Sequence, residues 1–167
     1  MKKLLLTSFA ALMFTATADA GFYVGGYVSG FDIKDNFAIF DNIALDATVG
    51  YRFTNGLRVE ADVLGIMMEP GFGDFRFGLM QARALYDIKI NDQLVPYFGI
   101  GVDTGIYSGR AEQFAFTGAL VAGVAYYLDR NLALDLMYTR GLGIALGYTN
   151  DINTFNNEVR LGMRYHF

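Results

Sequence analysis

The chain has 167 residues, a formal net charge of −4, one histidine and no cysteine, and 53% of its residues are hydrophobic and 16% aromatic. The lack of cysteine excludes disulfides, thiolate metal sites and a cysteine-linked lipid anchor, and a single histidine excludes histidine-rich metal clusters. The negative charge and scattered basic residues argue against nucleic-acid binding. The length predicts one domain, and we expect no cofactor and no metal.

The first 20 residues have the pattern of a secretory signal peptide. Lys2 and Lys3 form a basic start, residues 4–14 are largely apolar, and Ala18-Asp19-Ala20 is a small-x-small cleavage site. An N-terminal membrane helix is the alternative, but the apolar run falls short of the ~20 residues that a span needs. We predict cleavage after Ala20, which leaves residues 21–167 as the mature domain.

Three short polar turns divide the mature chain into units of similar length. They are Thr54-Asn55-Gly56, Asn91-Asp92-Gln93 and Asp129-Arg130-Asn131, and these residue types suit tight hairpins. The middle residues of successive turns are 92 − 55 = 37 and 130 − 92 = 38 positions apart, and the last residue follows 167 − 130 = 37 positions later. Each unit has a longer stretch rich in loop-forming residues in its middle, at 31–42, 68–74, 105–114 and 140–154. Four strand–loop–strand units predict eight strands.

Within the units, apolar and polar residues alternate with the two-residue period of a β-strand. In residues 57–66, for example, the alternation places Leu64 and Ile66 on the same face as Glu60 and Asp62. The first strand could face either way. The expected strands cover residues 21–31, 43–53, 57–66, 75–90, 95–104, 115–128, 132–139 and 157–167.

The apolar faces are aromatic near the turn-side ends of the strands. A soluble sandwich or a lipocalin-like barrel would turn such faces inward, but it has no need for seven large aromatic residues at one level. In a membrane barrel the same residues would form an interfacial girdle. The sequence therefore predicts an all-β fold, an eight-stranded antiparallel up-and-down transmembrane β-barrel. The predicted girdle consists of Tyr51, Phe53, Tyr86, Phe98, Tyr126, Tyr165 and Phe167.

The opposite faces carry charged residues and glycines, and the interior of an eight-stranded barrel has room only for packed side chains. We expect the charges to form an ion-paired network that fills the lumen, because an unpaired buried charge is costly. In it, Arg83 and either Arg160 or Arg164 would pair with Glu60 and Asp62; the alternative is separate side chains in trapped water. The expected interior charges are Asp46, Arg52, Arg58, Glu60, Asp62, Arg83, Asp87, Asp103, Asp135, Glu158, Arg160 and Arg164.

The chain ends in "RLGMRYHF", which matches a pattern of polar–x–Gly–x–x–aromatic–x–aromatic at Arg160, Gly162, Tyr165 and Phe167. An edge strand that ends in Phe by chance is the alternative, but the tail resembles the C-terminal signal of outer-membrane barrels. Over its mature length the chain resembles the eight-stranded OmpA/OmpX-like and opacity-type outer-membrane proteins, the porin family in the loose sense. This resemblance implies the outer membrane of a Gram-negative cell and recognition of the last strand by the barrel-assembly machinery.

Three kinds of function stay open at this point. The chain could be a structural barrel of the cell envelope, an adhesin or host-factor-binding barrel that acts through its loops, or a small pore or lipid A-modifying enzyme. We expect no catalysis, because the only histidine, His166, lies at the turn-side end without a Ser or Thr neighbour and suits an interior rim position. Outer-membrane lipid and lipopolysaccharide are the expected surroundings, and a monomer is the expected state.

Overall fold

The computed structural model describes residues 20–32, 42–68, 76–77, 79–107, 113–146 and 157–167, in which every regular element is a β-strand. No helix in this part of the chain is long and apolar enough to cross a membrane. The predicted signal peptide and most of the predicted loops lie outside the described residues. The strands are β1 (Gly21–Asp32), β2 (Asn42–Arg52), β3 (Leu57–Met68), β4 (Arg76–Phe77), β5 (Leu79–Asp87), β6 (Leu94–Tyr107), β7 (Gln113–Tyr127), β8 (Leu132–Leu146) and β9 (Asn157–His166).

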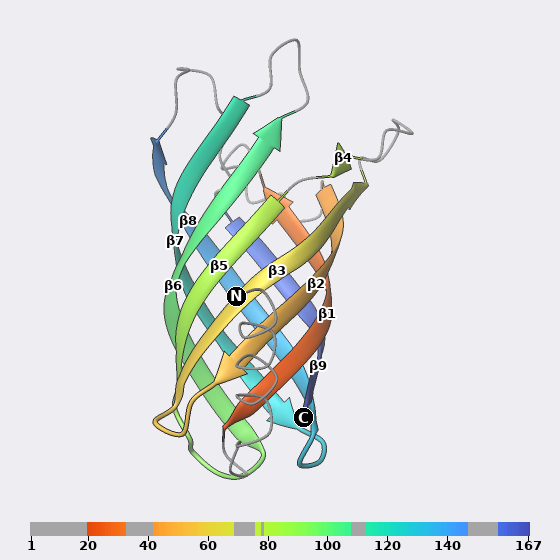
Figure 1. Ribbon diagram of the computed structural model, residues 1–167, viewed down its shortest axis with the longest axis vertical. Coiled ribbons are helices and arrows are strands. Elements are labelled where there is room, and N and C mark those ends of the chain that lie inside the picture. The colour runs from red at the N-terminus through yellow and green to blue at the C-terminus, as the bar shows by residue number, and fades with distance from the viewer. Residues whose placement is uncertain (1–19, 33–41, 69–75, 78, 108–112, 147–156) are drawn as a thin grey trace, which may run out of the picture.

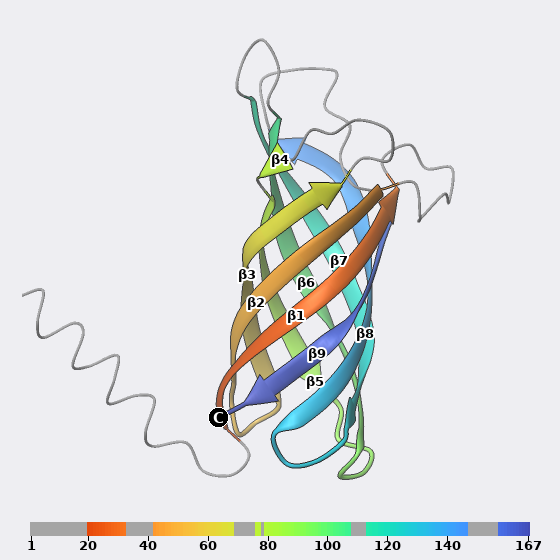
Figure 2. The ribbon, with the colours of Figure 1, turned by 90° about the vertical axis from the view of Figure 1, so that its right-hand side faces the viewer.

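The strands form one closed antiparallel sheet (Figure 1). Apart from β4 and β5, strands that follow one another in the sequence pair, and β9 pairs with both β8 and β1, so the sheet has no free edge along this seam. Both β4 and β5 pair with β3, and together they occupy the position of the fourth strand of the barrel. Figure 2 shows the strands running obliquely around the barrel axis. The prediction of an eight-stranded up-and-down barrel is confirmed.

The three predicted turns join β2 to β3, β5 to β6 and β7 to β8, and all lie at the same end of the barrel (Figure 1). Gly56 has a φ of 86°, a conformation that favours glycine. Asn91 Oδ1 accepts hydrogen bonds from two backbone N–H groups at 2.9 and 2.6 Å, and Asp129 Oδ1 does the same at 2.7 and 2.8 Å. These side chains therefore hold the turns through local backbone contacts.

The two faces of the sheet are inverted relative to those of a soluble protein. Outward residues such as Ile100 and Leu161 are 63% and 61% exposed, whereas Arg58 and Arg160 in the interior are 0% exposed. The sequence left open which face of β1 points inward, and in the structure Tyr23 is on the inner face. The high fraction of hydrophobic residues is thus explained by an apolar outer surface rather than by an apolar core.

Two predictions about strand geometry are wrong. The alternation expected through residues 57–66 breaks after Asp62, because Thr48 pairs with Asp62 whereas Ala47 pairs with Leu64. A β-bulge there inserts one extra residue into β3 and shifts the register of its pairing with β2. Also, β8 continues to Leu146 although a loop was expected from residue 140. Gly141 of that stretch pairs with Ala119 of β7, and the register of this ladder shifts between Thr117 and Ala119.

Candidate functional site: the charged barrel interior

Arg160, on β9, lies at the centre of the interior and is 0% exposed. Its Nη1 and Nη2 atoms donate hydrogen bonds to the two oxygens of Asp62 at 2.9 and 3.2 Å. Nη2 also donates to Thr48 Oγ1 at 3.3 Å and lies 3.5 Å from Asp46 Oδ2. A bidentate guanidinium–carboxylate pair is a strong and directional contact. Arg160 therefore joins β9 to β2 and β3 across the lumen.

Arg83, on β5, is the second arginine of this central cluster. Its Nη1 atom lies 3.2 Å from Asp62 and 3.5 Å from Glu60, and its Nη2 atom lies 3.6 Å from Glu158. All four side chains are buried. Asp62 is thus shared between Arg83 and Arg160, so neither of these buried cations lacks a counter-charge.

Gln81 connects the two arginines a second time. Its Oε1 atom accepts hydrogen bonds from Arg83 and, at 3.2 Å, from Arg160, while its Nε2 atom donates to Glu158 at 3.3 Å. An amide can donate and accept at once, which a carboxylate cannot do. The charge pattern that directed the sequence analysis gave no signal for this neutral residue.

A second cluster lies closer to the turns, around Asp135. Arg164 Nε lies 2.8 Å from Asp135 Oδ2, and the hydroxyls of Tyr97 and Tyr27 donate to Asp135 at 2.6 and 3.1 Å. The sequence analysis left open whether Arg160 or Arg164 pairs with the carboxylates of β3, and in the structure Arg160 does. Arg164 pairs with β8 instead.

Arg58, also in the turn-side cluster, is held mainly by aromatic rings. Its guanidinium carbon lies 4.3 Å from the centroid of Tyr97 and 5.8 Å from that of Tyr23. Its Nε atom is 3.7 Å from Asp87 and 3.9 Å from Glu60, and in the described structure none of its three nitrogens has a hydrogen-bond partner. Cation–π attraction and nearby carboxylates together compensate for burial of this charge.

Four inward tyrosines were missed by the sequence analysis, because alternation treats tyrosine as an apolar residue of the outer face. In the interior each phenol can donate to a carboxylate while its ring fills space. Tyr23, for example, donates to Glu60 at 2.7 Å. A tyrosine out of phase with its apolar neighbours is the signal that could have found them. The four are Tyr23, Tyr27, Tyr97 and Tyr127.

Three of these tyrosines lie over glycines on the neighbouring strand. Tyr23 pairs in register with Gly50, Tyr97 with Gly123, and Tyr27 with Gly162. A Cβ atom at any of these glycines would overlap the tyrosine ring. The glycines therefore supply the room that lets large rings enter a narrow barrel.

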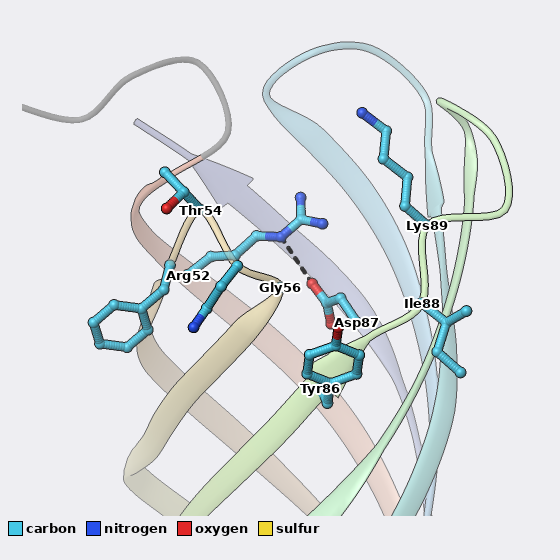
Figure 3. A pocket seen from close by; sticks show the side chains of 9 residues that line it. Arg52, Thr54, Gly56, Tyr86, Asp87, Ile88 and Lys89 are labelled. Atoms are coloured by element: carbon cyan, nitrogen blue, oxygen red, sulfur yellow. Dashed lines mark ion pairs between the residues drawn. The ribbon is translucent and has the colours of Figure 1, made fainter.

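The turn-side rim of the interior is closed by a further ion pair. Arg52 Nε lies 2.8 Å from Asp87 Oδ2, and Figure 3 shows the two side chains facing each other beside the β2–β3 turn. His166 stands at the same rim, with its Nε2 atom 3.4 Å from the Tyr127 hydroxyl and its ring 5.0 Å from that of Tyr23. Its ring lies beside those of Tyr23 and Tyr127, and its backbone N–H and C=O are hydrogen-bonded to Asn131. Acyl transfer would require a nucleophile beside the ring.

The seven predicted girdle residues lie on the outer surface near the turn end, from 72% exposed for Phe167 to intermediate for Tyr51. Several of their rings touch, as in the Tyr165–Phe167 pair with centroids 5.4 Å apart. Phe22 joins them through an edge contact with Tyr51 at 4.8 Å, which the sequence analysis did not foresee. In the C-terminal pattern, Arg160 and Gly162 are directed inward, and Tyr165 and Phe167 outward.

Across the described residues, no group of three His, Asp or Glu side chains is placed to hold a metal ion. Most of the interior charges instead neutralise one another, whereas the Oδ1 atom of the buried Asp103 has no hydrogen-bond partner among the described residues. Asp46, Glu60, Asp62, Asp135 and Glu158 each have an arginine within 4 Å. The arrangement is suited to filling and cross-linking the lumen.

Comparisons with known proteins agree with this architecture. A family model described as the outer membrane protein β-barrel domain matches residues 3–167, and no curated protein matches the sequence. The N-terminal β-barrel domain of Pseudomonas aeruginosa OprF is 17% identical, with a TM-score of 0.60, and the match covers 89% of this chain and 98% of that chain. Neisserial surface protein A is 20% identical, with a TM-score of 0.58 and coverages of 89% and 99%. A de novo designed transmembrane β-barrel is 16% identical, with a TM-score of 0.55 and coverages of 91% and 98%. At these identities the similarity shows the fold alone.

Proposed function

Because the chain belongs to the outer membrane protein β-barrel domain family, we propose that it is an integral outer-membrane protein with an occluded interior and a structural role in the cell envelope. In this proposal a signal peptide directs export and is cleaved after Ala20. The barrel-assembly machinery reads the last strand, and the three turns face the periplasm. The opposite end then faces the outside of the cell.

The observation that carries the proposal is the filled centre of the barrel. Arg160, Arg83, Asp62 and Gln81 project from β9, β5 and β3 into one continuous cluster, and each is at most 6% exposed. A water-filled channel would leave such polar side chains exposed to solvent. An eight-stranded barrel has little width beside them for a column of water.

Planar-bilayer recording of the purified full chain tests the occluded interior. The wild type should show no stable conductance steps, because the central cluster blocks the lumen. Arg160→Ala, which removes the side chain that joins β9 to β2 and β3, should give more frequent openings than Arg130→Ala, a matched change in an exposed turn residue. Stable, large steps from the wild type would contradict the proposal and favour a pore.

An experiment in cells separates a role of the barrel itself from a role of its loops as an adhesin. A strain without the protein should become more permeable to detergents, and the wild type should restore the barrier. A variant with residues 33–41 and 147–156 replaced by short glycine–serine connections should restore it as well, if the barrel is what matters. Restoration by the wild type alone would favour a surface interaction through the replaced segments.

A further inference from the structure

A cavity of about 290 Å³ lies at the turn end of the barrel, between the β2–β3 turn and the residues that end and follow β5 (Figure 3). Small-molecule sites start at about 300 Å³, so this cavity has room for a headgroup but not for acyl chains. Two of its lining residues, Phe53 and Tyr86, belong to the aromatic girdle, and Ile88 beside them is 45% exposed. The cavity therefore lies at the level of a membrane interface.

Two cations of the lining have donors that a ligand can reach. The side chain of Lys89 is 59% exposed and lies 3.6 Å from Asp92, which is itself 96% exposed. A surface pair of this kind contributes little to stability and can be exchanged for another anion. Arg52, with a 17% exposed side chain, has its Nε atom 2.8 Å from Asp87, and its Nη1 atom donates to the Tyr127 hydroxyl at 3.3 Å. Neither contact uses Nη2, the remaining donor of the guanidinium.

The charges of the cavity favour an anion. Arg52 and Lys89 stand against one carboxylate among the lining residues, that of Asp87, which leaves one positive charge in excess. Figure 3 shows the Arg52 guanidinium and the Lys89 ammonium on the turn side of the cavity, with Tyr86 further along the strand toward the apolar band. An anionic group bound by the two cations would therefore lie at the headgroup level, next to the aromatic residues.

The outer face of β5 beyond the cavity has small side chains. Ala84 and Ala82 follow Tyr86 in the outward series, and both are exposed. Their partners in the register of β6 are Ile100 and Val102, which are 63% and 47% exposed. The two alanines thus form a low strip beside larger apolar neighbours, along which an acyl chain can pack. This strip leads from the girdle into the apolar band.

We propose that the cavity binds the phosphate of an anionic glycerophospholipid in the periplasmic leaflet, with Arg52 and Lys89 as donors and an acyl chain along Ala84 and Ala82. A guanidinium and an ammonium both donate charge-assisted hydrogen bonds to phosphate oxygens. The single excess positive charge matches one phosphodiester, and the apolar strip beside the cavity favours a lipid over a free anion. The leaflet follows from the orientation in the proposed function, on which this inference rests.

Lipid retention by the purified full chain in a neutral maltoside detergent tests the site. The probes are phosphatidylglycerol, phosphatidylcholine with the same acyl chains, and inorganic phosphate, and the readouts are native mass spectrometry and the thermal unfolding midpoint. We expect phosphatidylglycerol to be retained best and to raise the midpoint, and inorganic phosphate to have no effect. Lys89→Gln should weaken retention about fivefold, the contribution of one basic residue at a membrane surface. Arg130→Gln, the matched change in another turn, should not.

A second pair of variants tests the strip for the acyl chain. Ala84→Leu raises the strip next to the cavity and should weaken retention of phosphatidylglycerol. Ala122→Leu makes the same change on the outer face of β7 and should not. Both alanines are exposed, so neither change disturbs the packed interior.

Other outcomes overturn the inference. Equal retention by Lys89→Gln and the wild type would show that the cavity is not the site, and equal stabilisation by inorganic phosphate would show a free-anion site. Equal retention by Ala84→Leu would exclude an acyl chain along β5. Each sample is also run on SDS gels with and without boiling. A wild type that shifts on boiling but retains no phosphatidylglycerol contradicts the lipid site only, whereas a wild type without a shift contradicts the proposed function itself.

Discussion

Individual side chains inside the barrel meet the cost of burying charge in two different ways. In the central cluster, Arg160 has carboxylate, amide and hydroxyl partners. In the turn-side cluster, Arg58 has ring faces and carboxylates at 3.7 Å or more. A guanidinium is weakly hydrated and stacks on aromatic faces, so lysine would be a poor substitute at either position. The central cluster is therefore the stronger link between strands.

The link between Arg160 and Asp62 should dominate the stability of the interior. Arg160→Met leaves a buried carboxylate short of a partner, and we expect a loss of about 3–5 kcal/mol in the free energy of unfolding. Urea unfolding in detergent measures it. A double-mutant cycle of Arg160→Met with Asp62→Asn should show strong coupling. The control cycle of Arg164→Met with Asp62→Asn should be nearly additive, since Arg164 pairs with Asp135. Equal coupling in both cycles would contradict the assigned pairs.

At the scale of strands and turns, the sequence predicts those strands whose residues alternate with a period of two and those turns that have a known turn motif. The three polar turns and the charged inner residues of β3, β5 and β9 follow from these rules. The bulge between Asp62 and Leu64 does not, because one extra residue changes the register without a distinctive residue type. Nor does the packing of three of the inner tyrosines, each of which needs a glycine in the neighbouring strand. Such cross-strand pairs are long-range contacts that no local pattern encodes.

These glycine–tyrosine pairs make a prediction with an internal control. Gly50→Ala places a Cβ inside the Tyr23 ring, so we expect a loss of about 1–3 kcal/mol, as for an overpacked site. Gly26→Ala, on the outer face of the adjoining strand, has nothing within 4 Å and should be nearly neutral. Both variants are compared by urea unfolding. Similar losses at both positions would mean that glycine matters here for the backbone and not for the ring.

The β7–β8 turn should respond to pH through Asp129. The N–H groups of Asn131 and Leu132 donate to its carboxylate and hold the pKa of Asp129 below its usual value of about 3.9. The turn is therefore stabilised at pH values above the usual pKa, and the contribution is lost as the pH falls through the lower, folded pKa. Titration of the Asp129 carboxyl by NMR should give a midpoint below that of the unfolded chain. Asp129→Asn keeps the acceptor oxygen and should remove this acid dependence.

For the whole molecule, closure of the sheet is the central property. Among the described residues every strand except the two-residue β4 has at least two neighbours, so backbone groups are satisfied internally even where the outer surface meets lipid. We therefore expect a barrel that migrates faster on SDS gels before boiling than after it. Recovery from the soluble periplasm, with no change of migration on boiling, would be incompatible with a closed membrane barrel.

Closure depends on the seam between β1 and β9, and the last residue lies at its end. The backbone N–H of Phe167 donates to the Phe22 carbonyl at 3.0 Å, and its ring, 72% exposed, packs against Tyr165. Phe167→Ala keeps the backbone contact and removes one surface ring. We therefore expect little change in unfolding of the refolded protein in detergent, within about 1 kcal/mol.

In cells the same change should have a larger effect if the assembly machinery reads the terminal aromatic residue. We expect Phe167→Ala to lower the amount of heat-shifting barrel in membranes several-fold while total synthesis is unchanged. Phe53→Ala is the matched control, because it removes an exposed girdle ring (40% exposed) far from the C-terminus. A similar decrease for both variants would assign the effect to the girdle. Normal levels of inserted Phe167→Ala protein would exclude a role of this residue in recognition, and the seam alone would then account for the aromatic terminus.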